Sequence, residues 1–598
     1  MELPRRTKGD EYTPPGRYRE LETRIQRAAA GKETPALFIY AFDQRTRLGP
    51  YIFVDKQLIP GAPIAIAAVL AAAGFENSRV VLQQWTPRIR PSRARLGGKP
   101  PELLLVSSMQ IHSAAAYRLI DDAWSLAEDR PLIVAGGAKA VYEPWDFFGL
   151  GPDGQRGADV VVTGEEFVLL ELLDRLIEFR GGRETWRQAF DRARASGALE
   201  DIPGLVYRRD PAPGPIRDLV NTGVQRLVQD LDELPFPLPA LGMFERPHRG
   251  TALDSHAVAA DRLGQYAKVL AIIMTHGCRF HCPYCPIHAY NQGTFRFRSP
   301  RRLVDEIASI RGRTGINSFF GTDDNFFNNH ETAESILSAL ARGTVNGCRF
   351  RDAVWIGTEG TEHDVDRCGA LMPLAREGGI RAIWFGIEDI TGELVKKGQS
   401  PEKTQRVFRN LLSNGIAPMP MMMHHDAQPL WSLRGLYGLL NQIRYLKRAG
   451  AVSVQVTFLT PMVGSRSYNQ AFEEGLVMRR VGGVDVADYQ FDGNHTIASR
   501  SRHPWRKQVN VLVAYASFYN PLRILKALFT VDALWKFRIV YQILGNLGLL
   551  RSVWASRAWL HRLRWGRIEK ATVHPAPKFR LVLPGEERSQ LDNAGMGT

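Results

Sequence analysis

Short β-rich apolar runs alternate with helix-length segments along most of this 598-residue chain, and this alternation limits the fold more than any other feature. Strands that are separated by helices pair in parallel, because only a long crossover can return the chain to the same edge of a sheet. The pattern comes in two blocks, residues 34–180 and residues 263–500. The sequence therefore predicts two α/β domains, each with ligand sites at the carboxyl ends of its parallel strands.

Small and acidic residues stand where the strands of the first block end. They are Ser107, Ser108, Gly136, Gly137, Gly164, Glu165 and Glu166. Ligands of doubly wound domains bind at this edge, although small residues here can also serve only to let helices pack closely. The block has no G-x-G-x-x-G after its first strand and no G-x-x-x-x-G-K-[ST], which argues against a dinucleotide or a nucleoside triphosphate. We therefore predict a Rossmann-like domain whose ligand stays open at this point.

Three of the chain's five cysteines, Cys278, Cys282 and Cys285, stand at C-x3-C-x2-C spacing directly after a predicted strand over 266–275. Three thiolates on one short loop can bind three corners of a [4Fe–4S] cluster and leave the fourth iron open. The alternative is a structural zinc site, which needs a fourth ligand. That ligand would be one of the nearby histidines: His276, His281 or His288.

The second block repeats strand and helix often enough for a full or partial TIM-type barrel, whose active site lies at the carboxyl ends of its strands. Polar residues close these strands and are candidate site residues: Asp323, Asp324, Glu359, Glu388, His424, His425 and Thr460. The two aspartates could instead cap the helix that follows them. Neighbours on a strand point to opposite faces, so at most one of His424 and His425 faces the barrel. The run "MPMMM" (419–423) is predicted to fill the core.

The cysteine loop, with an aromatic residue before its third cysteine, resembles the signature of the radical S-adenosylmethionine (SAM) superfamily. The resemblance implies a [4Fe–4S] cluster whose open iron binds SAM, and reductive cleavage of SAM to a 5′-deoxyadenosyl radical. It extends to the blocks "GTDDNFF" (321–327), "FGIEDITGELVKKGQSPEKT" (385–404) and "FLTPMVGSRSY" (458–468). The residues that it assigns to cofactor binding are Tyr284, Gly321, Asp323, Asp324, Glu359, Gly386, Glu388 and Thr460.

The first block resembles the cobalamin-binding domain of B12-dependent enzymes, whose strand ends surround the corrin and its nucleotide tail. The corresponding strand ends here are "VSS" (106–108), "AGG" (135–137) and "TGEE" (163–166). Many members carry D-x-H-x-x-G after the first strand, with a histidine that binds cobalt from below. This chain has "DQRTRLG", with Arg45 in place of the histidine. The resemblance therefore implies cobalamin bound without that ligand; His112 is a substitute candidate, but its position is also typical of a helix cap or core residue.

Together the two resemblances imply a cobalamin-dependent radical SAM enzyme with a [4Fe–4S] cluster, SAM and cobalamin. The commonest chemistry of that class is methylation of an unactivated carbon through methylcobalamin and a 5′-deoxyadenosyl radical. A cyclase or rearrangement enzyme that uses cobalamin without methyl transfer is the alternative, and a non-catalytic cobalamin or iron–sulfur sensor is a more distant one. Glu388, His424 and His425 are the candidate catalytic residues. The expected electron donor is a low-potential protein such as flavodoxin or ferredoxin.

Residues 501–598 are predicted to form a helical, basic region. Most of the formal net charge of +15 lies in residues 501–570, which hold thirteen Lys and Arg against Asp532 and Glu569. Helices rich in Trp, Leu and Arg suit either a peripheral membrane contact or a cap on the barrel. The first would favour a lipid or isoprenoid among small-molecule substrates. No nucleic-acid recognition motif is present, so no nucleic acid partner is expected.

The remaining segments are an N-terminal extension (1–33) and a linker (181–262). The extension lacks the apolar stretch of a signal peptide, and the sequence has no run of 18 uncharged apolar residues that would span a bilayer. The expected location is cytoplasmic, with peripheral binding at the inner membrane face if the basic helices contact lipid. The last 28 residues are expected to form a loose terminus.

Overall fold

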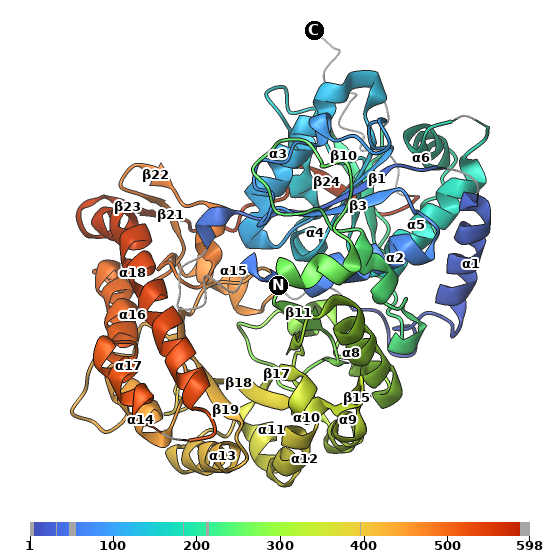
Figure 1. Ribbon diagram of the computed structural model, residues 1–598. Coiled ribbons are helices and arrows are strands. Elements are labelled where there is room, and N and C mark those ends of the chain that lie inside the picture. The colour runs from blue at the N-terminus through green and yellow to red at the C-terminus, as the bar shows by residue number, and fades with distance from the viewer. Residues whose placement is uncertain are drawn as a thin grey trace.

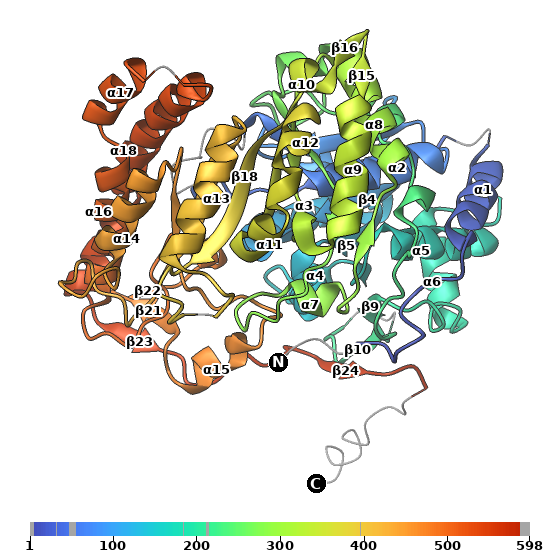
Figure 2. The same cartoon turned by 90° about the horizontal axis from the view of Figure 1, so that it is seen from below.

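A computed structural model of the protein describes residues 5–30, 33–46, 56–182, 184–210, 214–394, 396–530 and 532–585. Figure 1 shows two α/β domains packed against one another, with the helices of the C-terminal region along the outer side of the second. In Figure 2, the layer furthest from helix α1 is made by these C-terminal helices. They are α16 (Pro504–Phe518), α17 (Pro521–Leu528) and α18 (Trp535–Trp565).

The N-terminal domain is doubly wound, which confirms the predicted fold class. Five parallel strands run in the order β3-β1-β4-β5-β8, and the order reverses between β1 and β4, where such domains bind ligands. The strands are β1 (Ala36–Tyr40), β3 (Ser78–Leu82), β4 (Leu103–Ser107), β5 (Leu132–Gly136) and β8 (Val160–Val162). The surrounding helices are α1 (Arg17–Ala29), α2 (Gly61–Ala72), α3 (Ser113–Ala123), α4 (Ala138–Tyr142), α5 (Glu166–Phe179) and α6 (Trp186–Ala195). Every residue of β1 and β4 is buried, because helices cover both faces of the sheet.

Three short strands from distant parts of the chain extend this sheet. The predicted linker supplies β9 (Leu205–Arg208), which is antiparallel to β8, and β10 (Asp218–Asn221), which is antiparallel to β9. The C-terminal segment supplies β24 (Arg580–Val582), which pairs in parallel with β10. The expectation of a loose terminus was therefore wrong for residues 580–582. A three-residue strand that is held by long-range pairing leaves no periodic signal in the sequence.

The second domain is a partial barrel of six parallel strands, with a seventh short strand at its first edge. The six are β11 (Val269–Ile272), β14 (Ser318–Gly321), β17 (Trp355–Thr361), β18 (Ile380–Glu388), β19 (Ala417–His424) and β20 (Gln455–Phe458). Its main helices are α8 (Pro300–Thr314), α9 (His330–Arg342), α11 (Glu362–Arg367), α12 (Met372–Glu377), α13 (Pro401–Ser413) and α14 (Leu439–Ala449). Shorter elements around the barrel are β12 (Thr275–His276), α7 (Ile287–Tyr290), β13 (Arg296–Phe297), β15 (Thr344–Val345), β16 (Cys348–Arg349), α10 (Phe350–Ala353), α15 (Ser467–Glu473), β21 (Met478–Val481), β22 (Val484–Asp485) and β23 (Ile568–Lys570).

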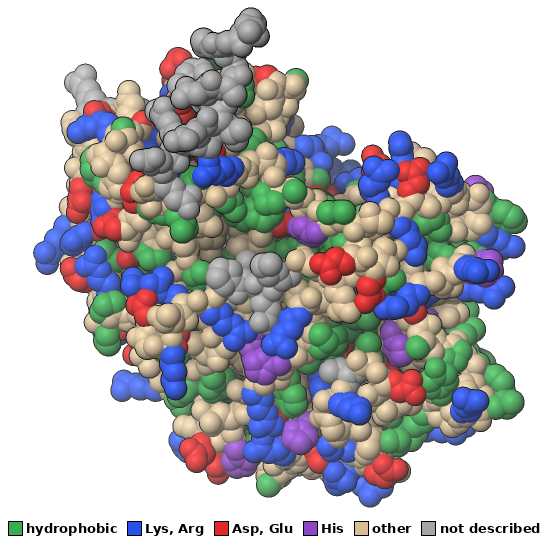
Figure 3. Space-filling model, turned by 180° about the vertical axis from the view of Figure 1, so that it is seen from behind, with side chains coloured by type: hydrophobic (Ala, Val, Ile, Leu, Met, Phe, Trp, Pro, Cys, Tyr) green, Lys and Arg blue, Asp and Glu red, His purple; other side chains and the backbone are tan. Residues whose placement is uncertain are grey.

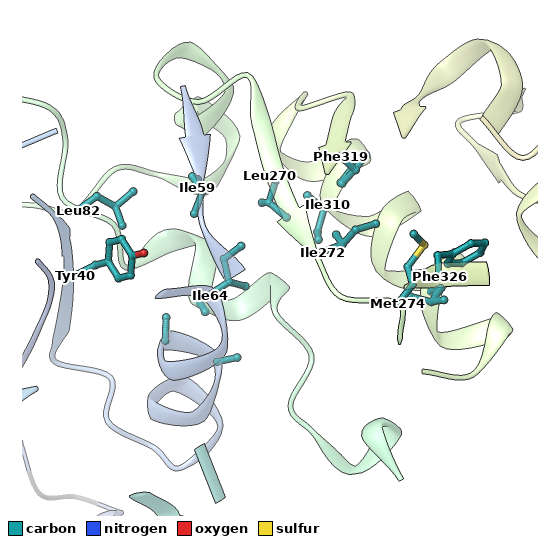
Figure 4. Close-up of a cluster of buried hydrophobic side chains, with 14 of the residues drawn as sticks. Tyr40, Ile59, Ile64, Leu82, Leu270, Ile272, Met274, Ile310, Phe319 and Phe326 are labelled. Carbon is teal, nitrogen blue, oxygen red and sulfur yellow. The ribbon is translucent and has the colours of Figure 1, made fainter. Parts of the chain in front are cut away.

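The seventh strand, β2 (Leu58–Ile59), comes from the N-terminal domain and joins the two domains, because it pairs with β11 of the barrel. In Figure 4, Ile59 and Ile64 lie in the middle of a continuous layer of apolar side chains. Tyr40 and Leu82 of the N-terminal sheet lie on one side of them, and Leu270 of the barrel lies on the other. The two domains thus share one hydrophobic core, which fixes their relative position.

Helix α16 covers the last barrel strand. The hydroxyl of Tyr515 donates to the carbonyl of Val456 at 2.7 Å and accepts from its N–H at 2.9 Å. Tyr519 pairs in the same way with Val454, at 2.8 and 2.9 Å. These hydroxyls satisfy backbone groups that would otherwise be exposed along an open sheet edge. The C-terminal region therefore caps the barrel through α16. Among the described helices, none combines the length and the hydropathy needed to cross a bilayer.

Candidate active site

A cavity of about 590 Å³ lies where the carboxyl ends of the barrel strands face the N-terminal domain. The N-terminal domain lines it with Met109, Gln110, Ile111, Ala138 and Tyr142. The barrel lines it with the three clustered cysteines and with Tyr284, Asp324, Glu359, Gly386, Glu388, Lys397, Met421, Met423 and Thr460. Residues that are more than 300 positions apart in the sequence therefore share one space.

The cysteine loop leaves β12 through Gly277, whose φ of +103° and close contact with the carbonyl of Thr294 leave no room for a Cβ atom. Burial raises the pKa of the Cys278 thiol, and it raises the pKa of the Cys285 thiol to about 12. Buried thiols with raised pKa values ionise only when a cation is present, and a metal centre supplies that charge.

The zinc alternative does not fit this loop. Among the described residues, the only group of His, Cys and acidic ligand atoms within 4.8 Å of one another is Glu245, His248 and Asp254, far along the chain from the cysteines. The sulfurs of a tetrahedral zinc site would lie about 3.8 Å apart, given Zn–S bonds of about 2.3 Å. His288 also donates from Nε2 to the carbonyl of Phe280, at 2.7 Å, which engages that nitrogen. The three cysteine sulfurs do not form such a group, so at least two of them lie more than 4.8 Å apart, which fits a cluster better than a single zinc ion.

The two adjacent aspartates after β14 have different roles. Asp323 accepts from the N–H groups of Met274 and Thr275, at 2.9 and 2.8 Å, and is buried below the cavity. Asp324 lines the cavity and accepts from the N–H of Gly277 at 2.7 Å. Burial raises the pKa of Asp323 to about 6. Both carboxylates therefore hold the segment that leads into the cysteine loop. Only Asp324 also faces the cavity.

A buried ion pair stands at the end of β18. Lys397 donates to Glu388 at 2.9 Å, and Glu388 has a φ of +62°, which is strained for a residue with a side chain. A Cβ atom at Gly386 would overlap the Glu388 carboxylate. Burial opposes the charge on Lys397, but Glu388 and the nearby cysteine thiols outweigh it and raise the pKa of the lysine. Sequence reasoning did not single out Lys397, although the quoted block "VKKG" contains it.

Glu359 projects from β17 into the same cavity. Burial, with Asp323 and Asp324 nearby, raises the pKa of Glu359 to about 8. Thr460, which follows β20, also lines the cavity. A carboxyl group that is protonated near neutral pH can donate a hydrogen bond inside an otherwise apolar space.

Neither predicted histidine lines the cavity. His424 lies within hydrogen-bonding distance of Gln428 (2.9 Å) and Asn510 (3.1 Å), and burial lowers its pKa to about 4. His425 lies 3.6 Å from Asp389. The alternation along β19 instead turns Met421 and Met423 toward the cavity, so the prediction that "MPMMM" only fills the core was wrong for these two. The period of two along the strand places these two residues on the same face, but it does not say which face meets the cavity.

On the N-terminal side, β4 and β5 end at the cavity. Gly137 has a φ of +90°, and a Cβ atom there would lie 2.6 Å from Ser107 Oγ and 2.7 Å from the carbonyl of Ser108. The Ser108 hydroxyl is buried and has no hydrogen-bond partner among the described residues. Gly136 completes β5 beside it. These strand ends thus form a tight turn with an unsatisfied polar group at the ligand crevice.

The residues after β8 have other partners. Glu165 forms an ion pair with Arg296 of the barrel at 2.5 Å and joins the two domains. Its N–H donates to Gln225, which also packs so closely on Gly164 that no Cβ atom would fit. Burial and the neighbouring carboxylate raise the pKa of Glu166. A second cavity of about 510 Å³ adjoins this region and shares Tyr142, Tyr290 and Val463 with the first cavity.

The loop after β1 carries Arg45, whose guanidinium is held by Asp43 at 2.6 Å and lies 4.1 Å from the ring centroid of Tyr489. His112 accepts from the N–H of Asp43 through Nδ1 at 3.1 Å, and its ring packs on Phe42. His112 is therefore a buried core residue with its Nδ1 engaged, and the rest of the loop, residues 47–55, lies outside the described residues.

The donor set fits an iron–sulfur cluster with one open corner on the barrel side and a large organic cofactor on the N-terminal side. The fit rests on three cysteines that line one cavity, on the turn at Gly137 that a Cβ atom would fill, and on the unsatisfied hydroxyl of Ser108. The fold and site thus agree with the two domains that the sequence resemblances implied, a barrel that carries the cysteine loop and a doubly wound domain that faces it.

Comparisons with known proteins agree with this arrangement. Residues 272–428 match the model of the radical SAM superfamily, so the chain contains a radical SAM domain. It is similar to the cytidylyl-2-hydroxyethylphosphonate methyltransferase of Streptomyces wedmorensis, at 25% identity over 42% of this chain and 45% of the relative. It is also similar to an uncharacterized methyltransferase of Pyrococcus horikoshii, at 23% identity over 62% of this chain and 70% of the relative. The chain thus spans less than half of the first of these relatives.

Two solved structures share the overall fold. OxsB, a cobalamin-dependent SAM radical enzyme solved with aqua-cobalamin and SAM, matches 87% of this chain and 72% of its own, with a TM-score of 0.57 and 12% identity. The radical SAM methyltransferase TsrM from Kitasatospora setae, solved with cobalamin and a [4Fe–4S] cluster, matches 87% of this chain and 100% of its own, with a TM-score of 0.54 and 15% identity. The match over both domains shows the predicted two-domain fold.

Proposed function

We propose that the protein is a cobalamin-dependent radical SAM methyltransferase that methylates an unactivated carbon of a small molecule. One observation carries the proposal: a single cavity is lined by Cys278, Cys282 and Cys285 on one side and by residues 109–111 of the N-terminal domain on the other. A radical source and a methyl carrier can act on one substrate only if both face the same space. The methyltransferase names of both curated relatives and of TsrM support this reading.

When bound, the cluster with SAM supplies a carbon radical and cobalamin supplies the methyl group. The chain's own residues bind and orient these groups. Lys397 and Glu388 present a fixed pair of opposite charges beside the cysteine loop, which suits the charged amino-acid part and the hydroxyls of SAM. Glu359 offers a hydrogen-bond donor, since its pKa is raised to about 8.

The remaining wall indicates what kind of substrate is accepted. Met421, Met423, Met462 and Phe491 line the cavity and make much of its surface apolar. Such a wall excludes water from a reactive radical and favours a substrate whose reacting part is hydrocarbon. We propose an apolar small molecule, of which a lipid or isoprenoid is one class, and a flavodoxin- or ferredoxin-type electron donor, whose acidic surface the net charge of +15 would attract.

The test uses full-length protein that is reconstituted anaerobically with iron, sulfide, cobalamin and SAM and then reduced. S-adenosylhomocysteine, methylcobalamin and 5′-deoxyadenosine are measured together by mass spectrometry. We expect all three products. Cys282→Ala should abolish 5′-deoxyadenosine, whereas Cys348→Ala, which removes an exposed cysteine outside the cavity, should not.

Two results would contradict the proposal. 5′-Deoxyadenosine without S-adenosylhomocysteine or methylcobalamin would show that no methyl group reaches cobalt, and cyclisation or rearrangement would replace methylation. A full cluster and bound cobalamin with no 5′-deoxyadenosine at all would point to a sensor.

A further inference from the structure

Between residues 540 and 556, the buried positions of helix α18 hold small or polar residues and its exposed positions hold large apolar residues. Its buried side includes Gly545, Gly548, Ser552 and Ser556. A Cβ atom at Gly545 would overlap the ring of Tyr519, so glycine is required for the helix to lie this close to the cap. The two serine hydroxyls donate to the carbonyls one turn earlier, at 2.8 and 2.7 Å, and need no other partner. Nearer its C-terminus the helix buries Trp559 and Leu563, so the unusual arrangement is confined to residues 540–556.

The outward side of α18 carries an apolar stripe. Val540, Ile543, Leu547, Leu550 and Trp554 follow one another at intervals of three and four residues, which places them on one face. All five are exposed, from 41% for Ile543 to 70% for Leu550. A helix that packs only on its own protein normally shows the opposite arrangement, with its large apolar residues toward the core.

Helix α17 extends the stripe. Leu522, Leu525, Leu528 and the following Phe529 are exposed, and Phe529 is 85% accessible. Twelve of the twenty exposed large apolar side chains among the described residues lie between 522 and 565. Single exposed apolar residues are normal, but this concentration marks an interaction site. Residues 522–565 on the solvent side of α17 and α18 are called the α17–α18 face below.

The charges around this face are almost all positive. Residues 521–567 hold nine Lys and Arg and one carboxylate, Asp532, which Arg538 pairs at 3.0 Å. The cations lie beside the aromatic rings: the guanidinium of Arg557 is 3.3 Å from the ring centroid of Trp554, and that of Arg564 is 4.7 Å from the ring of Trp565. Figure 3 views the molecule from behind and shows apolar and basic side chains interspersed along its right-hand edge, the side on which the C-terminal helices lie.

We propose that the α17–α18 face docks on an anionic lipid bilayer, with both helices lying in the plane of the interface. Leucines and tryptophans enter the boundary between headgroups and acyl chains, and the surrounding Lys and Arg pair with anionic headgroups. The alternative occupant, a second copy of this chain, would bring two sets of nine cations together with almost no carboxylates to balance them, so charge complementarity favours lipid. The proposal stands independently of the catalytic one.

The experiment measures the partition of the full-length protein onto vesicles by flotation. Vesicles of phosphatidylcholine with 30% phosphatidylglycerol are compared with vesicles of phosphatidylcholine alone, at about 0.1 and 0.5 M salt. We expect binding to the anionic vesicles that weakens at the higher salt. Leu547→Gln with Leu550→Gln should lower the partition coefficient at least about tenfold, because each leucine buries apolar area in the interface. Arg557→Gln with Arg564→Gln should lower it about fivefold per charge.

The matched control is Leu433→Gln with Val484→Gln, which removes two exposed apolar residues outside the α17–α18 face and should leave partition unchanged. All variants change exposed side chains, so circular dichroism should show the same thermal midpoint for each. Equal weak binding to both vesicle types would overturn the proposal. So would a dimer in solution that the Leu547 and Leu550 variant converts to monomer, because the face would then be an interface between two copies.

Discussion

The ion pair between Lys397 and Glu388 offers a direct test of how the cavity wall is held. Lys397 Nζ lies 2.9 Å from the Glu388 carboxylate, and the two side chains are only 11% and 9% exposed. Replacing Lys397 by Met keeps the length of the side chain but removes the charge. Glu388 would then remain buried without a counter-ion, at a backbone position that is already strained.

The expected loss follows from this burial. Removing one partner of a buried pair costs about 3–5 kcal/mol, whereas replacing both partners by neutral groups is often close to neutral. We therefore expect Lys397→Met to lower the free energy of unfolding by about 3–5 kcal/mol. The double variant Glu388→Gln, Lys397→Met should recover at least about 2 kcal/mol of that loss, because no uncompensated charge is left.

The chain contains a matched pair for comparison. Arg351 Nη1 lies 2.6 Å from Glu377, but the side chains are 43% and 39% exposed. Solvent screens such pairs, so Arg351→Met should cost no more than about 1 kcal/mol. The measurement is urea unfolding of the metal-free protein, followed by tryptophan fluorescence and by far-UV circular dichroism so that separate domain transitions are visible.

Equal small losses for Lys397→Met and Arg351→Met would refute the reasoning, because burial would then make no difference to the pair. A double variant that is less stable than Lys397→Met would also refute it, since the cost would not come from an unpaired Glu388.

Three further outcomes are expected. Phe at both Tyr515 and Tyr519 should lower the free energy of unfolding by about 2–4 kcal/mol, because the last barrel strand loses its hydrogen-bonding partners, whereas Tyr437→Phe, which removes an exposed hydroxyl, should be nearly neutral in the same urea titration. The raised pKa of Glu359 means that the folded protein holds this proton up to about pH 8, while the unfolded chain releases it near pH 4.3. The free energy of unfolding, measured relative to that of Glu359→Gln, should therefore fall as pH rises between these values. A difference that does not change with pH would show that Glu359 is not buried as described. Gly137→Ala should reduce the cobalamin that is retained after gel filtration, measured by absorbance, whereas Gly9→Ala, at a similar φ but with open space around it, should not.

The parts of the fold that follow local periodicity were predictable from the sequence. The buried apolar runs that became β1, β4 and β18 gave both the parallel sheets and the edge at which ligands bind. The placement of the three cysteines on one loop was also predictable, because the spacing of ligands on a short loop is a local property of the sequence. Glu388 and Asp324 followed from their place at strand ends.

Long-range pairing was not predictable in this way. The two-residue strand β2 and the three-residue strand β24 are stabilised only by partners hundreds of residues away. The direction of single side chains was also hidden: His424 and Met423 are neighbours on β19, and the register of the strand, which the sequence does not state, turned the methionine inward and the histidine toward Asn510. The exposure of the apolar stripe on α18 was not predictable from periodicity, because the same spacing of apolar residues fits either the buried or the exposed face of a helix.

The shared core has a consequence for the proposed chemistry. A radical and a methyl donor that approach one carbon must be held within a few tenths of an ångström of a productive arrangement. A mobile joint between the two domains would not give that precision. Here β2 belongs to one domain by sequence and to the other by pairing, Ile59 and Ile64 pack on both sheets, and Glu165 pairs with Arg296 across the boundary. Packed cores deform little, so the walls of the cavity keep their separation without a closing motion. Substrate entry must then depend on loops at the rim of the cavity, since movement of one whole domain against the other would break the core that both share.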